Sequence, residues 1–238
     1  MKKEIEYQVA DAIMGRPHGF SVGNRYFYLY PLTLGKMYLL QRVVESMEIN
    51  QENLSSNIAF EALRLASEKR EECLRYIVYN TFKEKDEHFD EKEILVRTDY
   101  LGKKLSESDI AELIIMLLTQ DKTQQFFKHL GIDKEQQRLS DVMKAKSKND
   151  KNNYSFGGLS VFGTLIDSAC ERYGWSKEYV VWGIDYASLR LMLADKVVSV
   201  YISDEERKKI PASLLSGSQD SIKGTKENMA KIKAMDWK

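Results

Sequence analysis

The stretch FSVGNRYFYLYPLTLG, residues 20–35, contains the signals for both kinds of secondary structure expected in this chain. Gly23 and Asn24 are residue types that tolerate the positive backbone angles of a tight turn, and aromatic and aliphatic residues flank them on both sides. Pro31 has no amide hydrogen, so it ends the pairing of the second strand. The stretch therefore predicts a small two-stranded hairpin. A ribbon of this size is not stable alone, so it must pack on helices.

Helices are expected to follow the hairpin directly. Apolar side chains at Leu34, Met37, Tyr38 and Val44 begin a helical pattern. Residues 56–82 are rich in Ala, Leu, Glu, Lys and Arg, and they carry an apolar stripe beside a charged run. This composition predicts one long helix.

A further helix start is marked by Ser106, which together with Asp109 has the residue types of a reciprocal cap. Apolar residues follow at the spacing of one buried face, so the helix is expected to run to Leu130 and to end at Gly131. A polar helix over residues 133–146 is expected next.

Residues 144–153 are rich in lysine, serine and asparagine and contain no apolar residue larger than alanine. Such a segment cannot bury itself, and we interpret it as a basic flexible linker. Its positive charge could contact phosphates, but a solvated tether is the simpler interpretation. The linker ends an N-terminal domain of hairpin and helices, residues 1–143.

Residues 154–203 are predicted to form a unit of three short, aromatic-rich helices, because Ser160, Ser176 and Asp185 each precede a helical pattern as capping residues do. The polar residues 204–238 are interrupted by proline and glycine and are expected to be a mobile tail with a short helical pattern near its end. The predicted fold is therefore mainly α: a helical bundle domain with a small N-terminal β-hairpin, plus a short three-helix C-terminal unit.

The composition argues against several classes of partner. The 36 basic and 36 acidic side chains cancel to a formal net charge of zero, so no global field attracts the protein to nucleic acid or anionic lipid. The longest apolar stretch, residues 110–118, is far shorter than the roughly 20 residues that span a bilayer. No apolar run of a signal peptide is recognisable, and Cys73 and Cys170 are expected to be free core thiols. These features favour a cytoplasmic protein.

No constellation of residues in the sequence supports a chemical reaction. His18, His88 and His129 lie apart, none has a second ligand at metal-binding spacing, and we expect them to be surface or capping residues. Residues 158–162 approach a nucleophile elbow, but Phe162 stands where that motif requires glycine. We expect a protein that is not an enzyme, with no catalytic residue, metal or cofactor.

Aromatic residues are densest between Tyr173 and Tyr186. Large flat side chains often anchor protein interfaces, although a small helical unit also needs them to fill its core. We predict that some of them contact another protein. The predicted partner-binding residues are Trp175, Tyr179, Trp182, Leu189 and Met192.

The order of three short helices is also typical of DNA-binding modules, whose last helix needs basic side chains. Between Tyr186 and Tyr201 the basic residues are Arg190 and Lys196 alone. A DNA-binding regulator is therefore kept only as an alternative.

Two motifs together resemble the tail assembly chaperones of long-tailed bacteriophages. They are YLYPLTLG, residues 28–35, and YGWSKEYVVW, residues 173–182, which a leucine-rich helix follows. The family commonly has a strand pair that leads into a Pro-Leu-Thr-Leu helix start, and a Tyr-Gly-Trp-Ser turn before a short aromatic helix.

The resemblance implies a non-enzymatic protein that binds the tape-measure protein during tail morphogenesis, in the cytoplasm of the bacterial host. It would shield that helical, apolar-striped partner from aggregation until tail tube subunits polymerise around it. Family members are often made in short and extended forms by ribosomal frameshifting, whereas both motifs here lie in one reading frame. A structural virion component, such as a connector or tail-completion protein that contacts neighbouring virion subunits, therefore stays open as an alternative. Oligomeric state is open as well.

Overall fold

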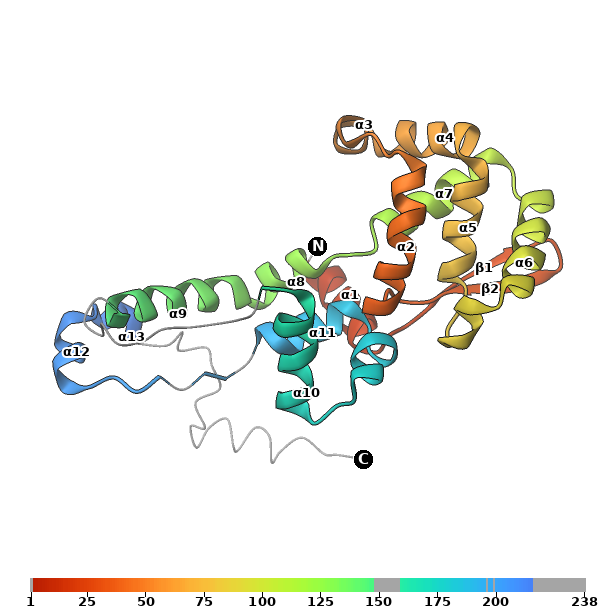
Figure 1. The fold of residues 1–238 in the computed structure, drawn as a ribbon. Helices are drawn as coiled ribbons and strands as arrows, with labels where there is room; N and C mark the ends of the chain where they lie inside the picture. The colour runs from red at the N-terminus through yellow and green to blue at the C-terminus, as the bar shows by residue number, and fades with distance from the viewer. Residues whose placement is uncertain (1, 148–158, 196, 199, 216–238) are drawn as a thin grey trace, which may run out of the picture. The chain divides into compact units, whose positions relative to one another are not determined.

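The computed structural model describes residues 2–147, 159–195, 197–198 and 200–215. The chain forms two compact units. The first unit comprises Met1–Leu130 and Gly157–Lys196, and the second comprises Gly131–Phe156 and Val197–Lys238. The described residues are mainly α-helical with one antiparallel hairpin, which confirms the predicted fold class (Figure 1).

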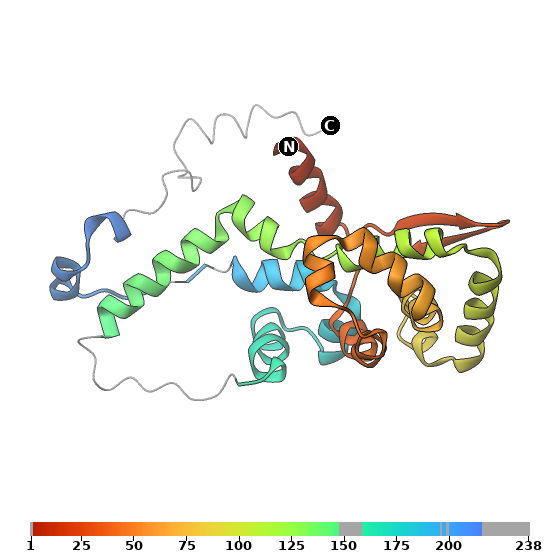
Figure 2. The ribbon, with the colours of Figure 1, turned by 90° about the horizontal axis from the view of Figure 1, so that it is seen from above.

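The hairpin pairs β1 (His18–Val22) with β2 (Arg25–Leu29). Gly23 has φ of 59°, so the turn uses a backbone conformation that suits glycine. The tip of the hairpin lies beside α6 (Figure 2). The Tyr100 hydroxyl of α6 donates a hydrogen bond to the Val22 carbonyl oxygen at 2.9 Å. The predicted hairpin and its attachment to helices are both confirmed.

The helices of the first unit carry the apolar patterns seen in the sequence. They are α1 (Lys2–Ile13), α2 (Leu34–Met47), α3 (Gln51–Ser56), α4 (Ile58–Glu68), α5 (Arg70–Asn80), η1 (Asp86–Phe89), α6 (Glu91–Lys104), α7 (Glu107–Leu118), α8 (Thr123–Leu130), η2 (Phe162–Asp167), α10 (Ser168–Tyr173), η3 (Tyr179–Gly183) and α11 (Tyr186–Ala194). The main core lies between the hairpin and helices α2, α4, α5, α6 and α7, with fully buried side chains such as Met47, Leu65, Ile77, Phe82 and Ile114.

The expected single helix over residues 56–82 is wrong. The helical conformation is interrupted at Asn57, whose side chain accepts a hydrogen bond from the Phe60 amide and so begins α4. A second interruption lies at Lys69, where φ is −125° and ψ is 41°. The second break lets α4 pack on α7 while α5 packs against α2 and α6. Burial of two apolar faces on different neighbours therefore overrides the helical propensity of the segment.

The helix that begins after Ser106 is shorter than expected. Ser106 and Asp109 form the predicted reciprocal cap, and α7 then ends at Leu118. The chain turns before α8 begins, and α8 ends at Leu130 before Gly131, which has φ of 74°. Both predicted ends are confirmed, but the continuous helix between them is not.

The caps expected for the three short helices are present. The Ser160 hydroxyl accepts from the Gly163 amide at 3.4 Å, and the Ser176 hydroxyl accepts from the Tyr179 amide at 3.2 Å. Asp185 accepts from the amide three residues later at 2.8 Å and begins α11. Local capping chemistry alone therefore located these three starts.

These three helices do not form a domain of their own, so the predicted division at residues 144–153 differs from that of the structure. Leu34 of α2 is buried among Ile166, Val180 and Leu189 in one cluster. The Tyr186 amide donates to the Leu32 carbonyl oxygen at 2.7 Å. Three short helices bury too little apolar surface alone, and α2 completes their core.

The second unit contains α9 (Ile132–Ser147), α12 (Asp204–Lys209) and α13 (Ala212–Leu215). Arg138 of α9 donates to the Leu214 carbonyl oxygen at 3.0 Å, which joins α9 to α13. Helix α9 confirms the polar helix expected over residues 133–146 and includes residues 144–147 of the predicted linker. The rest of that linker, and residues 216–238 of the predicted tail, lie outside the described residues. In the part of the chain that the structure describes, every helix is too short or too polar to cross a bilayer.

Candidate functional site

Trp182, one of the predicted partner-binding residues, packs against the first turn of α2. Its ring is half-buried and lies 5.5 Å from the His88 ring and 6.0 Å from the Phe89 ring. A Cβ atom at Gly35 would lie only 2.6 Å from the Trp182 ring, so glycine at this position lets the ring rest against the first turn of α2. Trp182 therefore joins η3 to α2.

Trp175 and Tyr179 form a separate aromatic cluster. The Trp175 ring stacks on Tyr173 with centroids 4.6 Å apart and meets Tyr179 edge to face at 5.1 Å. The Tyr173 hydroxyl donates to the Met192 carbonyl oxygen at 2.9 Å, and the Met192 side chain is exposed. Within the described segments, no ring contact joins this cluster to Trp182. The structure therefore does not bring the five predicted residues into one patch.

Leu189 requires a correction, because its side chain is 0% exposed. It packs with Ile166, Ala169 and Val180 in the smaller core cluster. The spacing of apolar residues along α11 identified a buried face, but that face is covered by the protein itself. Leu189 is therefore a core residue and offers no surface to a partner.

An apolar groove runs beside α2, and we name it the α2 groove. It has a volume of about 530 Å³, and its walls come from α2, Phe89, η2 and η3. Three aromatic side chains in its lining are strongly exposed: Phe162 (60%), Phe89 (58%) and Tyr38 (51%). Trp182, Leu34 and Val181 also line it. The groove has the apolar, aromatic character that is typical of sites for a protein partner.

A second apolar hollow of about 430 Å³ shares Leu34 and Tyr38 with the α2 groove. Met37, Val44 and Leu165 are among its other lining residues. Apolar surface therefore continues over both sides of the N-terminal half of α2.

Tyr38, Phe89 and Phe162 were not predicted as site residues. The sequence placed Tyr38 in an apolar helical pattern, which predicts burial rather than exposure. Phe89 and Phe162 reach the groove from segments far apart along the chain. No local signal brings those segments together, so only the folded structure reveals the groove.

Two ionisable side chains, Lys36 and His88, are buried in the first unit, and the His88 ring contacts Trp182. Lys36 is 1% exposed, and burial lowers its pKa to about 8. His88 is 2% exposed, which corrects its prediction as a surface or capping residue, and burial lowers its pKa as well. Its Nδ1 lies 2.8 Å from the Glu84 carbonyl oxygen, and its Nε2 has no hydrogen-bond partner among the described residues. With so little exposure, neither side chain is accessible to a ligand from solvent.

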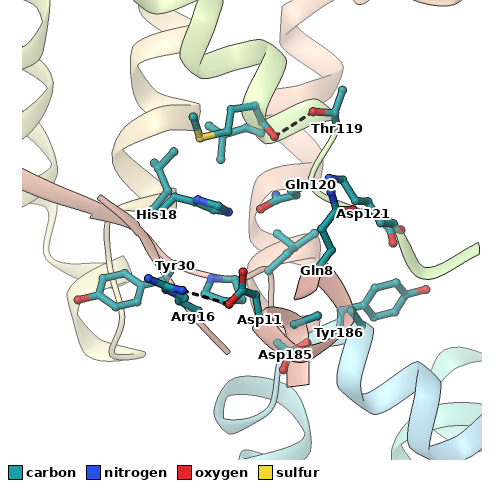
Figure 3. A pocket seen from close by; sticks show the side chains of 18 of the residues that line it. Gln8, Asp11, Arg16, His18, Tyr30, Thr119, Gln120, Asp121, Asp185 and Tyr186 are labelled. Carbon is teal, nitrogen blue, oxygen red and sulfur yellow. Dashed lines mark hydrogen bonds and ion pairs between the residues drawn. The ribbon is translucent and has the colours of Figure 1, made fainter. Parts of the chain in front are cut away.

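A second site candidate in the first unit is a cavity of about 340 Å³ between α1, the start of β1, residues 119–122 and residues 185–187 (Figure 3). Four of its charged side chains, those of Arg16, Asp11, Asp121 and Asp185, are engaged within the protein. Arg16 pairs with Asp11 at 3.3 Å. Asp121 accepts from the Thr123 amide at 3.0 Å, and Asp185 caps α11.

The Gln120 side chain lines the cavity of Figure 3, and its buried Nε2 has no hydrogen-bond partner within the described ranges. The cavity offers this donor and an apolar lining that includes Leu29 and Leu117. It does not place a nucleophile beside a base. Among the described residues, no group of three or more His, Cys, Asp or Glu side chains could hold a metal ion.

Comparison of the chain with models of protein families, with curated proteins and with solved structures finds no match.

Proposed function

We propose that this protein binds an amphipathic helix of another protein in the α2 groove and acts as an assembly chaperone. The observation that carries the proposal is the groove itself, with three strongly exposed aromatic side chains in an apolar lining. Exposed apolar surface is costly in water, and a partner that covers it gains free energy in proportion to the area buried. An apolar helix face laid into an apolar groove is a common mode of protein recognition.

The resemblance to phage tail assembly chaperones supports the choice of partner. Residues 28–35 contribute Leu34 and Gly35 to the groove, and residues 173–182 contribute Val181 and Trp182. The two motifs that carry the resemblance therefore meet at one site, although they lie far apart in the sequence. We accordingly propose the tape-measure protein, a long helical protein with apolar stripes, as the partner during tail assembly.

A DNA-binding role receives less support from the structure. Arg190 of α11 donates to the Tyr186 hydroxyl at 2.6 Å and lies over the Phe127 ring at 5.8 Å. A guanidinium held against two rings is not presented to phosphates or base edges. Lys196 lies outside the described residues.

The proposed function is tested by co-expressing this protein with the tape-measure protein encoded in the same genome. We expect the chain to keep the tape-measure protein soluble and to co-purify with it. Phe162→Ser should weaken both effects, because it replaces an exposed apolar side chain in the groove. Leu95→Ser is the matched control, since Leu95 is similarly exposed (65%, against 60% for Phe162) but does not line the groove.

Whether this protein is present in purified phage particles distinguishes an assembly chaperone from a structural virion component. A chaperone should be absent from purified phage particles. Stoichiometric presence in mature particles would favour a virion component, and failure to bind the tape-measure protein would contradict the proposal.

A further inference from the structure

The charged side chains that line the α2 groove all have the same sign. The charged side chains in its lining are Arg42 and Lys177, and both are cationic. Across the described part of the chain, neither forms an ion pair. Among the described residues, the Lys177 side chain contacts the Phe162 ring, whose centre lies 5.5 Å from Nζ.

Neighbouring charges behave differently. Glu178, which follows Lys177 directly, is paired with Lys85 at 2.8 Å. Glu45 lies one helical turn after Arg42, but its carboxylate accepts a hydrogen bond from the Gln41 side chain at 3.0 Å and does not pair with Arg42. In a chain whose formal net charge is zero, two cations without a carboxylate partner at one apolar groove are a local excess of positive charge.

The two cations belong to different walls of the groove. Arg42 lies on α2, one turn after Tyr38 and therefore on the same face. Lys177 lies in the segment just before η3, next to the exposed Phe162 ring. A helix that fills the apolar lining would bring the residues beside its apolar stripe close to these cations.

We propose that the α2 groove selects an amphipathic helix whose apolar stripe is flanked by Asp or Glu side chains. This inference rests on the proposed function and names the chemistry of the partner. Partly exposed ion pairs are individually weak, so each cation should change affinity by roughly two- to fivefold and the two together by about tenfold. The preference should decrease as salt is added, because ions screen exposed charges.

Two designed helical peptides of about 20 residues test the proposal. They share one stripe of leucine and methionine, and they carry either glutamate or lysine at the flanking positions. Binding is followed by the fluorescence of Trp182, in a protein whose other two tryptophans are replaced (Trp175→Phe and Trp237→Phe). The glutamate peptide should bind about tenfold more tightly at low salt.

Charge reversal at the groove should invert that preference. In the Arg42→Glu/Lys177→Glu variant the lysine peptide should become the tighter ligand. The matched control is Arg75→Glu/Lys104→Glu, which makes the same change in net charge at two exposed positions outside the groove lining. The control should keep the original preference, and circular dichroism should show that all variants are folded.

The outcomes separate the two proposals. If both peptides bind equally well, or if the control reverses the preference as strongly as the groove variant does, the charge inference is overturned while a helix-binding groove stands. If neither peptide changes the Trp182 fluorescence, the groove does not bind helices, and both proposals fail.

Discussion

Replacement of Gly35 by alanine is the sharpest test of how η3 packs on α2. The added methyl group would lie 2.6, 2.7 and 2.8 Å from three carbon atoms of the Trp182 ring. Carbon atoms normally pack at roughly 3.5–4.0 Å, so the ring would have to move by about 1 Å. His88 and Phe89 lie against the same ring and oppose that movement.

Two opposing effects set the size of the change. Overpacking of this kind costs about 1–3 kcal/mol. Alanine gains up to about 1 kcal/mol over glycine in a helix, and the gain is smaller in a first turn such as that of α2. We therefore expect Gly35→Ala to lower the free energy of unfolding by about 1–2 kcal/mol.

The contact with Trp182 is isolated by a double-mutant cycle. In a Trp182→Ala background the clash is gone, so Gly35→Ala should be neutral or slightly stabilising there. The coupling energy between the two positions should be about 2 kcal/mol. Urea unfolding of the four proteins, followed by far-ultraviolet circular dichroism, measures all the free energies required.

A coupling energy within about 0.5 kcal/mol of zero would refute the reasoning. It would mean that the first turn of α2 and the Trp182 ring are not in contact. The same result would remove the geometric link between the two motifs that support the proposed function.

Three further predictions concern buried charges and a helix cap. A hydrogen bond from Arg64, aided by the Asn50 amide, lowers the Glu61 pKa from 4.5 to about 2. The stability that this carboxylate contributes is therefore complete above its unfolded pKa, and it is lost as pH falls toward 2. Glu61→Gln should therefore cost about 1–3 kcal/mol at neutral pH and flatten the acid side of a stability profile measured with urea; an unchanged acid limb would contradict this. Burial lowers the Lys36 pKa from 10.5 to about 8, so the unfolded chain binds more protons and stability should rise as pH increases between these values. Lys36→Met should remove that rise and add about 2–3 kcal/mol at pH 7, and a destabilised variant in thermal unfolding would show that the charge has a favourable partner. Ser106→Ala should cost about 1 kcal/mol in urea unfolding because it removes the reciprocal cap of α7, whereas Ser108→Ala, on the exposed face of the same helix, should change little.

Part of the α2 groove could be foreseen from the sequence. Trp182 was predicted as a partner-binding residue and lines the groove. Tyr38, Phe89 and Phe162, its most exposed aromatic residues, were not predicted. Leu189 was predicted to face a partner but lies in the core. Periodicity identifies an apolar face, but it does not show what covers that face.

The sequence by itself determined the features that depend on a few neighbouring residues. Gly23 made the hairpin turn, Gly131 followed a helix end, and Ser106, Ser176 and Asp185 began helices as expected. In each case the deciding hydrogen bond or backbone angle lies within about four residues, so local chemistry suffices.

Only the tertiary structure decided the break at Lys69, the packing of η3 on α2, and the burial of Lys36 and His88. Each of these depends on groups that are distant in sequence and meet only after folding. The free energy gained by covering two apolar faces on different neighbours exceeds the small preference of a segment for one straight helix. For that reason the helix starts could be predicted from the sequence, whereas the α2 groove, which the packed helices form, could not.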